Sequence, residues 1–136
     1  MSCDSRIVMG VIGNDIHVVA NKIIARGLQE AGFNVCNLGA GCQPRELVAA
    51  AIEHAAHAVV ISTLGGEGEP WCVSIREDLN TAGAGEVVLY VGGNLGVGQC
   101  VAADVEERFL KLGFDRAYHQ PASLDILIND LQLDLQ

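Results

Sequence analysis

The sequence is poor in aromatic and basic residues, and both shortages exclude classes of function. Aromatic residues make up 4% of the 136 residues, whereas Gly is abundant at 16. This composition favours an α/β protein with tight turns over a disordered or fibrous chain. Only 8 Lys and Arg stand against 17 Asp and Glu, which gives a net charge of −9. A surface of that charge repels nucleic acid and anionic membranes, so we expect neither as a partner.

The chain also lacks long apolar runs and paired cysteines. No apolar run approaches the length of a membrane span, and residues 1–5 lack the three-part layout of a signal peptide. We therefore expect a cytoplasmic location. The five cysteines are odd in number and none forms a C-x-x-C pair, which argues against a disulfide framework or a structural zinc site. They are Cys3, Cys36, Cys42, Cys72 and Cys100.

Strand-like and helix-like segments alternate along the chain. Apolar runs typical of buried strands occupy residues 6–12, 33–38, 58–62, 87–91 and 115–118. Helical spacing follows in residues 18–31, from Pro44 onward, in 72–82 and 101–112, and from Ser123 onward. Five βα units predict a flavodoxin-like (Rossmann-like) α/β fold with a doubly wound, five-stranded parallel sheet of order 2-1-3-4-5. No linker or repeat interrupts the pattern, so we interpret residues 1–136 as a single domain.

Apolar residues at helical spacing predict which side of each helix packs on the sheet. The inward residues expected for the first helix are Val19, Ile23, Ile24, Leu28 and Ala31. Those expected for the second helix are Leu47, Val48, Ala51, Ile52 and Ala55.

Three Gly-rich loops follow the first, third and fourth predicted strands. They cover residues 13–17, 62–69 and 92–98. In the predicted strand order these strands are neighbours, and ligands of such sheets bind beyond the carboxyl ends of the strands. Glycine lets the backbone approach a large flat ligand closely, although it also serves simple turns. The opposite edge has no matching runs, so three converging loops indicate a ligand site.

The first of these loops contains Asp15 and His17, separated by one residue. A neutral imidazole is a good ligand for a transition metal, and a carboxylate on its other nitrogen fixes the tautomer. A single D-x-H pattern is common, and on its own it favours a structural or solvated histidine. We expect no metal at the other histidines, of which His54 and His57 lie near a predicted helix end and His119 follows the last strand.

These loops together resemble a known family. Asp15-x-His17, Ser62-x-Leu64 and Gly92-Gly93 are similar to the D-x-H-x-x-G, S-x-L and G-G signature of cobalamin-dependent mutases and methyltransferases. Further segments, including residues 31–35, 66–69 and 113–116, look like the small subunit of glutamate mutase. The resemblance covers nearly the whole chain.

The resemblance implies that the chain binds adenosylcobalamin, with the cofactor's dimethylbenzimidazole displaced from cobalt and His17 in its place. Asp15 would bond to that histidine, and the nucleotide tail would enter a slot beside the first strand and first helix. The implied cofactor-binding residues are Asn14, Asp15, Ile16, His17, Val18, Ser62, Thr63, Leu64, Gly92, Gly93, Asn94, Leu95, Gly96, Val97 and Gly98.

The resemblance also implies a partner. In the family, a larger barrel-type subunit holds the substrate, and two small and two large subunits form a heterotetramer. The reaction interconverts L-glutamate and threo-3-methylaspartate by a radical mechanism, so this chain would carry no catalytic residue and would be inactive alone.

The sequence departs from the family pattern at three positions, of which Ala20 lies on the first turn of the first predicted helix. Ala20 replaces the signature glycine, Gly65 stands where an aromatic residue usually follows S-x-L, and Trp71 adds bulk. These departures leave open a corrinoid-binding module of another mutase or of a methyl-transfer system. A signalling receiver domain shares the expected fold but needs an Asp after the third strand, where this chain has Ser62. A flavin carrier needs a Ser/Thr-rich phosphate loop, which the first loop lacks.

Overall fold

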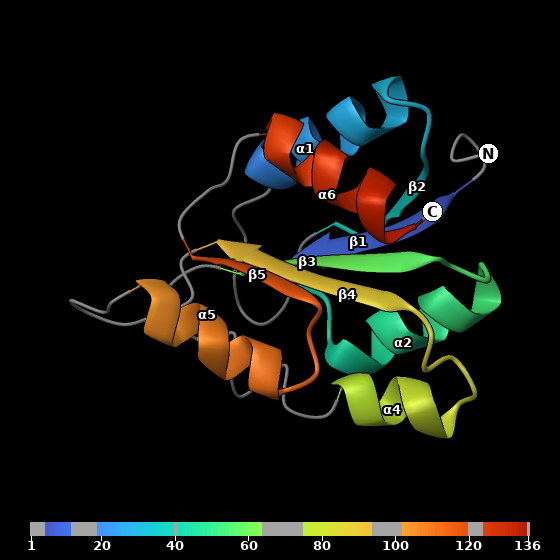
Figure 1. Ribbon diagram of the computed structural model, residues 1–136. Coiled ribbons are helices and arrows are strands. Elements are labelled where there is room, and N and C mark those ends of the chain that lie inside the picture. The colour runs from blue at the N-terminus through green and yellow to red at the C-terminus, as the bar shows by residue number, and fades with distance from the viewer. Residues whose placement is uncertain are drawn as a thin grey trace.

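Five parallel strands form one sheet in the order β2-β1-β3-β4-β5 (Figure 1). The computed structural model describes residues 5–11, 19–39, 41–63, 75–93, 102–119 and 124–135. The strands are β1 (Arg6–Val11), β2 (Asn34–Asn37), β3 (Ala58–Thr63), β4 (Val88–Gly93) and β5 (Arg116–His119). The predicted flavodoxin-like fold class and strand order are confirmed.

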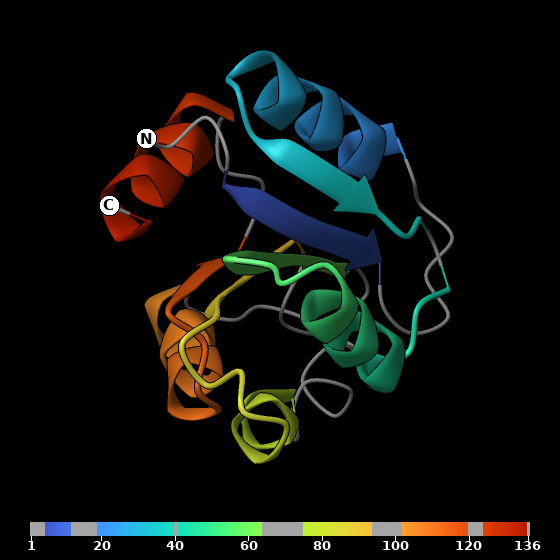
Figure 2. The same cartoon turned by 90° about the vertical axis from the view of Figure 1, so that its right-hand side faces the viewer.

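Helices cover both faces of the sheet. They are α1 (Val19–Glu30), α2 (Pro44–Glu53), α4 (Ile75–Thr81), α5 (Ala102–Lys111) and α6 (Leu124–Asp134). Figures 1 and 2 show α1 and α6 on one face and α2, α4 and α5 on the other. No helix in the described part of the chain combines the length and apolar character needed to cross a membrane.

Each face of the sheet has its own apolar core, because neighbouring residues of a strand point to opposite sides. Ile7, Met9, Val60 and Tyr90 pack beneath α1 and α6, and the adjacent positions pack beneath α2, α4 and α5. The buried residues that α1 and α6 contribute are Ala25, Leu28, Leu127 and Leu131, and the partly buried Ile24 and Ile128 pack beside them. The three central strands are therefore apolar on both sides, which explains the uninterrupted apolar runs of the sequence.

The inward sides of α1 and α2 differ in part from the prediction. In α1, Leu28 is buried as expected, but Ile23 is 61% exposed and Ala31 is also exposed. The helix is rotated so that the small Ala25 and the polar Asn21 face the sheet. Apolar spacing could not reveal this rotation, because it ranks Ile23 above both residues.

In α2, Pro44 begins the helix as predicted, and Leu47, Val48 and Ala51 are buried. Ile52 is 46% exposed, and Ala55 is exposed beyond the end of the helix, with a φ of 50°. The predicted inward side therefore extends too far, because the chain leaves the helix after Glu53.

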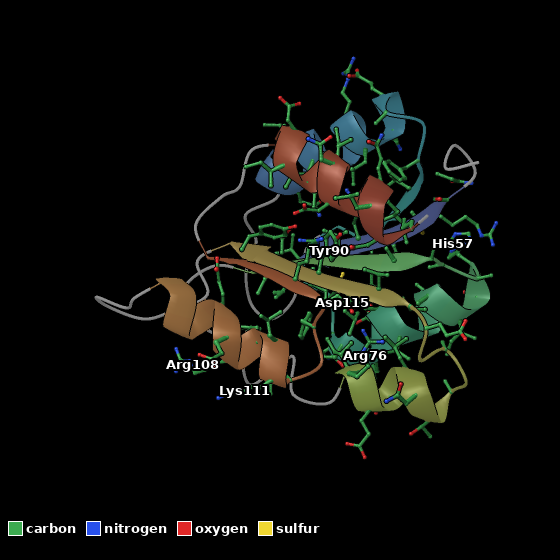
Figure 3. The ribbon with its side chains drawn as sticks, in the orientation of Figure 1. His57, Arg76, Tyr90, Arg108, Lys111 and Asp115 are labelled. Carbon is green, nitrogen blue, oxygen red and sulfur yellow. The ribbon has the colours of Figure 1, made fainter. Side chains whose placement is uncertain are left out.

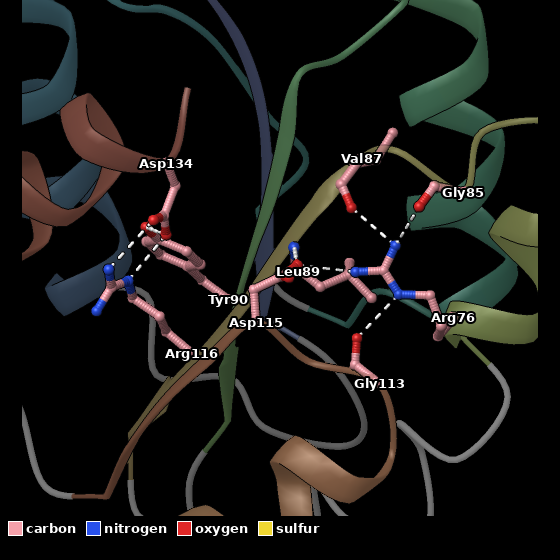
Figure 4. A network of polar contacts seen from close by, with 9 residues as sticks. All are labelled: Arg76, Gly85, Val87, Leu89, Tyr90, Gly113, Asp115, Arg116 and Asp134. Carbon is pink, nitrogen blue, oxygen red and sulfur yellow. Dashed lines mark hydrogen bonds and ion pairs between the residues drawn. The ribbon is translucent and has the colours of Figure 1, made fainter. Parts of the chain in front are cut away.

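One arginine attaches the short helix α4 to the sheet (Figures 3 and 4). The guanidinium of Arg76 donates to the carbonyl oxygens of Gly85, Val87 and Gly113 over 2.8–2.9 Å, and to Asp115 Oδ2 over 2.8 Å. A planar donor of this kind can satisfy several acceptors at once. Arg76 therefore joins the turns that precede β4 and β5 on the face opposite α1 and α6.

Candidate functional site

Four residues lie in one line across the carboxyl ends of the strands. Val11 of β1 pairs with Ser62 of β3, Ser62 pairs with Gly92 of β4, and Gly92 pairs with Tyr118 of β5. We call these four residues the carboxyl row. Paired residues of parallel strands point to the same face of a sheet, so the whole row shares one face.

That face is the one covered by α1 and α6. Two residues before the carboxyl row, Met9, Val60 and Tyr90 pack with the residues of these two helices, and Tyr118 itself packs against the same cluster. Because side chains alternate with a period of two, the row continues this face to the edge of the sheet. The row therefore lies where the chain leaves β1, β3 and β4.

Gly92 interrupts the row of side chains. The described atoms nearest to a Cβ added to Gly92 all belong to Tyr118, at 3.8 Å or more, which is an ordinary van der Waals contact. Ser62 beside it is half-buried. Gly92 therefore leaves the row without a side chain between Ser62 and Tyr118, which is the feature that allows a ligand to approach a backbone closely.

A buried asparagine lies on α1 over the same face. Asn21 is 1% exposed, and its Oδ1 accepts a hydrogen bond of 2.6 Å from Asn37 Nδ2 at the end of β2. Asn37 Oδ1 in turn accepts one of 3.1 Å from the backbone N–H of Gly39. The Nδ2 of Asn21 has no hydrogen-bond partner within the described ranges. Such groups are rare in folded proteins, where nearly all buried donors are bonded.

The end of β1 is held on both sides of its backbone. Val11 N–H donates to Gly39 O over 2.8 Å, and Cys42 N–H donates to Val11 O over 2.9 Å. Gly39 and Gly41 have φ values of 83° and 72°, which residues with a side chain rarely adopt. The segment after β2 therefore fixes the position from which residues 12–18 depart.

Ionic and tyrosine contacts join α6 to β4 and β5 beneath the row (Figure 4). Arg116 binds both carboxylate oxygens of Asp134, at 2.8 and 3.1 Å, and the buried Tyr90 donates to the same carboxylate. Tyr118 donates to Asp130 in the same way. The hydrogen bond from Arg116 lowers the pKa of Asp134. Burial, reinforced by the acidic acceptors, raises the pKa of both tyrosines, which stay neutral donors.

The structure brings part of the predicted site together. Ser62 and Thr63 end β3 beside Gly92 and Gly93, which end β4. The other predicted residues, including the cobalt ligand His17, lie outside the described residues: Asn14, Asp15, Ile16, His17, Val18, Leu64, Asn94, Leu95, Gly96, Val97 and Gly98. Their roles, and those of the four placed residues, remain predictions.

Two histidines, His54 and His57, lie at the amino-terminal edge of the sheet, opposite the carboxyl row. His54 caps the end of α2, with its Nε2 3.4 Å from Cys36 Sγ. His57 Nδ1 accepts a hydrogen bond of 2.9 Å from the backbone N–H of Arg6, and Figure 3 shows it at the amino-terminal ends of the strands. No group of three His, Cys, Asp or Glu within the described residues could hold a metal ion.

A hollow also lies at that amino-terminal edge, between the ends of α2, α4 and α6. Ala55, His57, Ala84, Glu86 and Leu135 are among the residues that line it. None of its described lining residues belongs to the carboxyl row.

Comparison with known proteins identifies the family. Residues 5–115 match the B12 binding domain, which is well over half of the chain. The chain belongs to the B12-binding domain family. A glutamate mutase sigma subunit from Clostridium tetani is 43% identical over 129 residues, covering 95% of this chain and 94% of the relative. This similarity confirms the resemblance to the small subunits of glutamate mutase.

Solved structures support the fold of this B12-binding domain. A cobalamin-binding protein from Desulfitobacterium hafniense matches with a TM-score of 0.78 at 18% identity, over 96% of this chain and 59% of that chain. A receiver domain of a response regulator from Mycobacterium tuberculosis matches with a TM-score of 0.67 at 11% identity, over 97% and 96%. Two such different proteins share the fold, so the sequence relationship, and not the fold, carries the family assignment.

Sequence reasoning missed Val11, Asn21 and Tyr118 as parts of the site. Asn21 had a signal, because it stands at helical spacing from Ala25 and Leu28 on the inward side of α1. Val11 and Tyr118 had none, because only the register of the strands places them beside Ser62 and Gly92.

The contacts of Asp134 predict a dependence of stability on pH. Asp134→Asn should lower the free energy of unfolding at pH 7 by about 1–3 kcal/mol, the order expected for hydrogen bonds to a charged group. The pKa of Asp134 is lower in the folded protein than in the unfolded chain. The advantage of the wild type is therefore present above pH ~4 and is lost as the pH falls through the folded pKa.

Urea unfolding at pH 7 and pH 3 checks this expectation. The difference between wild type and Asp134→Asn should shrink at the lower pH. Asp125→Asn is the matched control, since Asp125 is exposed in the first turn of the same helix. A difference of the same size at both pH values would contradict the ionic role of Asp134.

Proposed function

We propose that this chain is the cobalamin-binding subunit of an adenosylcobalamin-dependent carbon-skeleton mutase that interconverts L-glutamate and threo-3-methylaspartate. The observation that carries the proposal is the carboxyl row, which lacks a side chain at Gly92 and lies where the chain leaves β1, β3 and β4. Similarity to glutamate mutase sigma subunits over 95% of the chain supports both the cofactor and the reaction.

The described residues fit the nucleotide tail of a cobalamin. Gly92 leaves room for a flat group against the sheet, and the half-buried Ser62 supplies a hydroxyl beside it. The amide of Asn21, which has no partner among the described residues, offers a donor over the same face. Thr63 and Gly93 end the same two strands and complete the edge from which residues 64–70 and 94–100 depart.

His17 is proposed as the lower ligand of cobalt. Its neutral imidazole would bind the metal, and Asp15 would accept the hydrogen bond from its other nitrogen, which fixes the ring and raises its basicity. When bound, adenosylcobalamin supplies a cobalt–carbon bond that breaks homolytically to give a radical. The residues of this chain hold and orient the cofactor, and none acts on the substrate.

The substrate site is proposed to lie on a larger barrel-type subunit, with two small and two large subunits in the assembly. The relatives are named sigma subunits, which supports the need for a partner. The strand ends carry the proposed cofactor site, so the partner would cover this edge of the sheet. The isolated chain would bind cofactor without turning over substrate.

A second candidate keeps the cofactor and changes the reaction. Ala20, Gly65 and Trp71 depart from the family pattern around the loops, which favours a corrinoid module for a different mutase or a methyl-transfer system. Assay of the chain with a glutamate mutase large subunit separates the two, because only the first candidate would restore formation of 3-methylaspartate.

Replacement of His17 tests the proposed cobalt ligand. Protein loaded with cob(II)alamin should show an EPR superhyperfine pattern that changes when histidine is labelled with nitrogen-15. His17→Ala should lose this dependence because the labelled axial nitrogen is removed, and its affinity for cobalamin should fall.

His54→Ala is the control, since His54 lies at the opposite edge of the sheet. Its EPR pattern should equal that of the wild type. A wild-type spectrum that keeps the pattern of bound dimethylbenzimidazole, or a spectrum unaffected by His17→Ala, would contradict the proposal.

A methyl group at Gly92 tests the position of the tail. The described atoms nearest to the new methyl group belong to Tyr118 and lie at ordinary contact distance, so Gly92→Ala should fold without cofactor with nearly unchanged stability. The dissociation constant for cobalamin should rise about tenfold or more, because overpacking a tight site costs about 1–3 kcal/mol. Absorbance titration measures the affinity, and thermal unfolding measures the stability.

Gly10→Ala provides the opposite control. A Cβ at Gly10 would lie 2.9 Å from Leu47 Cδ2 and 3.0 Å from Cys42 Sγ, on the α2 face. This variant should lose stability while its folded fraction keeps its affinity for cobalamin. Unchanged affinity in Gly92→Ala would place the tail elsewhere.

A further inference from the structure

The direction of the Asn21 amide follows from its neighbours. The backbone N–H of Gly39 can only donate, so the atom of Asn37 that it contacts is the oxygen. Asn37 therefore presents its NH₂ group to Asn21, and the atom of Asn21 that accepts it is again the oxygen. A flipped amide at either residue would bring two donors together. Asn21 thus turns its own NH₂ group away from β2.

The amide of Asn21 lies at the edge of the sheet where the cofactor site is proposed. Asn37 is the last residue of β2, and Asn21 lies in the first turn of α1, so the pair sits at the carboxyl edge. The side chain of Asn21 is buried on the face that carries Ser62 and Gly92. The buried amide is directed away from β2, and the described residues supply no acceptor for it, so it offers one hydrogen-bond donor at this edge of the sheet.

We propose that Asn21 Nδ2 donates a hydrogen bond to an oxygen of the sugar–phosphate part of the cobalamin nucleotide tail. This inference rests on the proposed function and adds a recognition contact to it. In a bound cobalamin the sugar–phosphate part would lie between the corrin and the base. A donor near the carboxyl edge would therefore meet oxygen acceptors on this part of the cofactor. The contact makes recognition depend on the tail as well as on cobalt.

Asn37→Asp tests the contact without a change at Asn21. The introduced carboxylate would still accept the Gly39 N–H, but it has no donor for Asn21, so the Asn21 amide should turn and present its oxygen to the tail. Asn37 is exposed, and the variant should therefore fold. Its thermal midpoint without cofactor should rise, because Asn21 Nδ2 gains that carboxylate as an acceptor.

Affinity is measured for two probes, cobalamin and cobinamide, which lacks the nucleotide tail. The dissociation constant of Asn37→Asp for cobalamin should rise about tenfold, which corresponds to the loss of one hydrogen bond to a charged group. The constant for cobinamide should stay unchanged. Asn34→Asp is the matched control, because Asn34 is an exposed residue at the opposite end of the same strand, and it should bind both probes as the wild type does.

Two further variants, Asn21→Leu and Asn21→Leu/Asn37→Asp, distinguish the loss of the Asn21 amide contact from an effect of the new negative charge. If Asn37 acts through Asn21, Asn21→Leu should lower the affinity for cobalamin but not for cobinamide. Adding Asn37→Asp to this variant should then change neither affinity further. A further loss in the double variant would assign the effect to repulsion by the new carboxylate and overturn the inference. Equal losses for both probes, or unchanged cobalamin affinity in Asn21→Leu, would also overturn it. A wild type that binds no cobalamin would instead refute the proposed function.

Discussion

The in-register pairing of parallel strands is the constraint on which the candidate site depends. Backbone hydrogen bonds align β1, β3, β4 and β5 so that one residue from each strand falls in the carboxyl row. A shift of one residue in any strand would move its member to the opposite face. The burial of both faces of the central strands holds the register, because a shifted strand would disrupt two apolar cores. The site is thus a consequence of how the core packs.

The two faces of the sheet have different tasks. Beneath α2, α4 and α5 the contacts are structural, with Arg76 joining the turns before β4 and β5 through four hydrogen bonds. Beneath α1 and α6 the core is apolar, and Asn21, Ser62 and Tyr118 are polar residues near the carboxyl edge. Toward the opposite edge, the pairing of Arg116 with Asp134 joins α6 to the sheet. The face with the candidate site therefore has polar contacts at both ends of its strands.

Sequence reasoning predicted the strand order, the helix start at Pro44 and the edge where Ser62 and Gly92 meet. These features follow from local patterns, since periodicity and glycine runs are visible in a linear chain. The rotation of α1 was not visible, because it depends on how the helix packs on the short edge strand β2. Asn21 is the clearest case: its spacing was readable, but only the hydrogen bond with Asn37 shows which way its amide points.

Nuclear magnetic resonance of nitrogen-15-labelled protein titrated with a diamagnetic cobalamin tests the location of the site most directly. We predict the largest chemical-shift changes at the backbone amides of Val11 and Gly92 and at the side-chain amide of Asn21. Amides in α4 and around Ala84, on the opposite face and at the amino-terminal edge, should change little. The largest changes around Ala84 and His57, with Gly92 and Asn21 unaffected, would contradict this location.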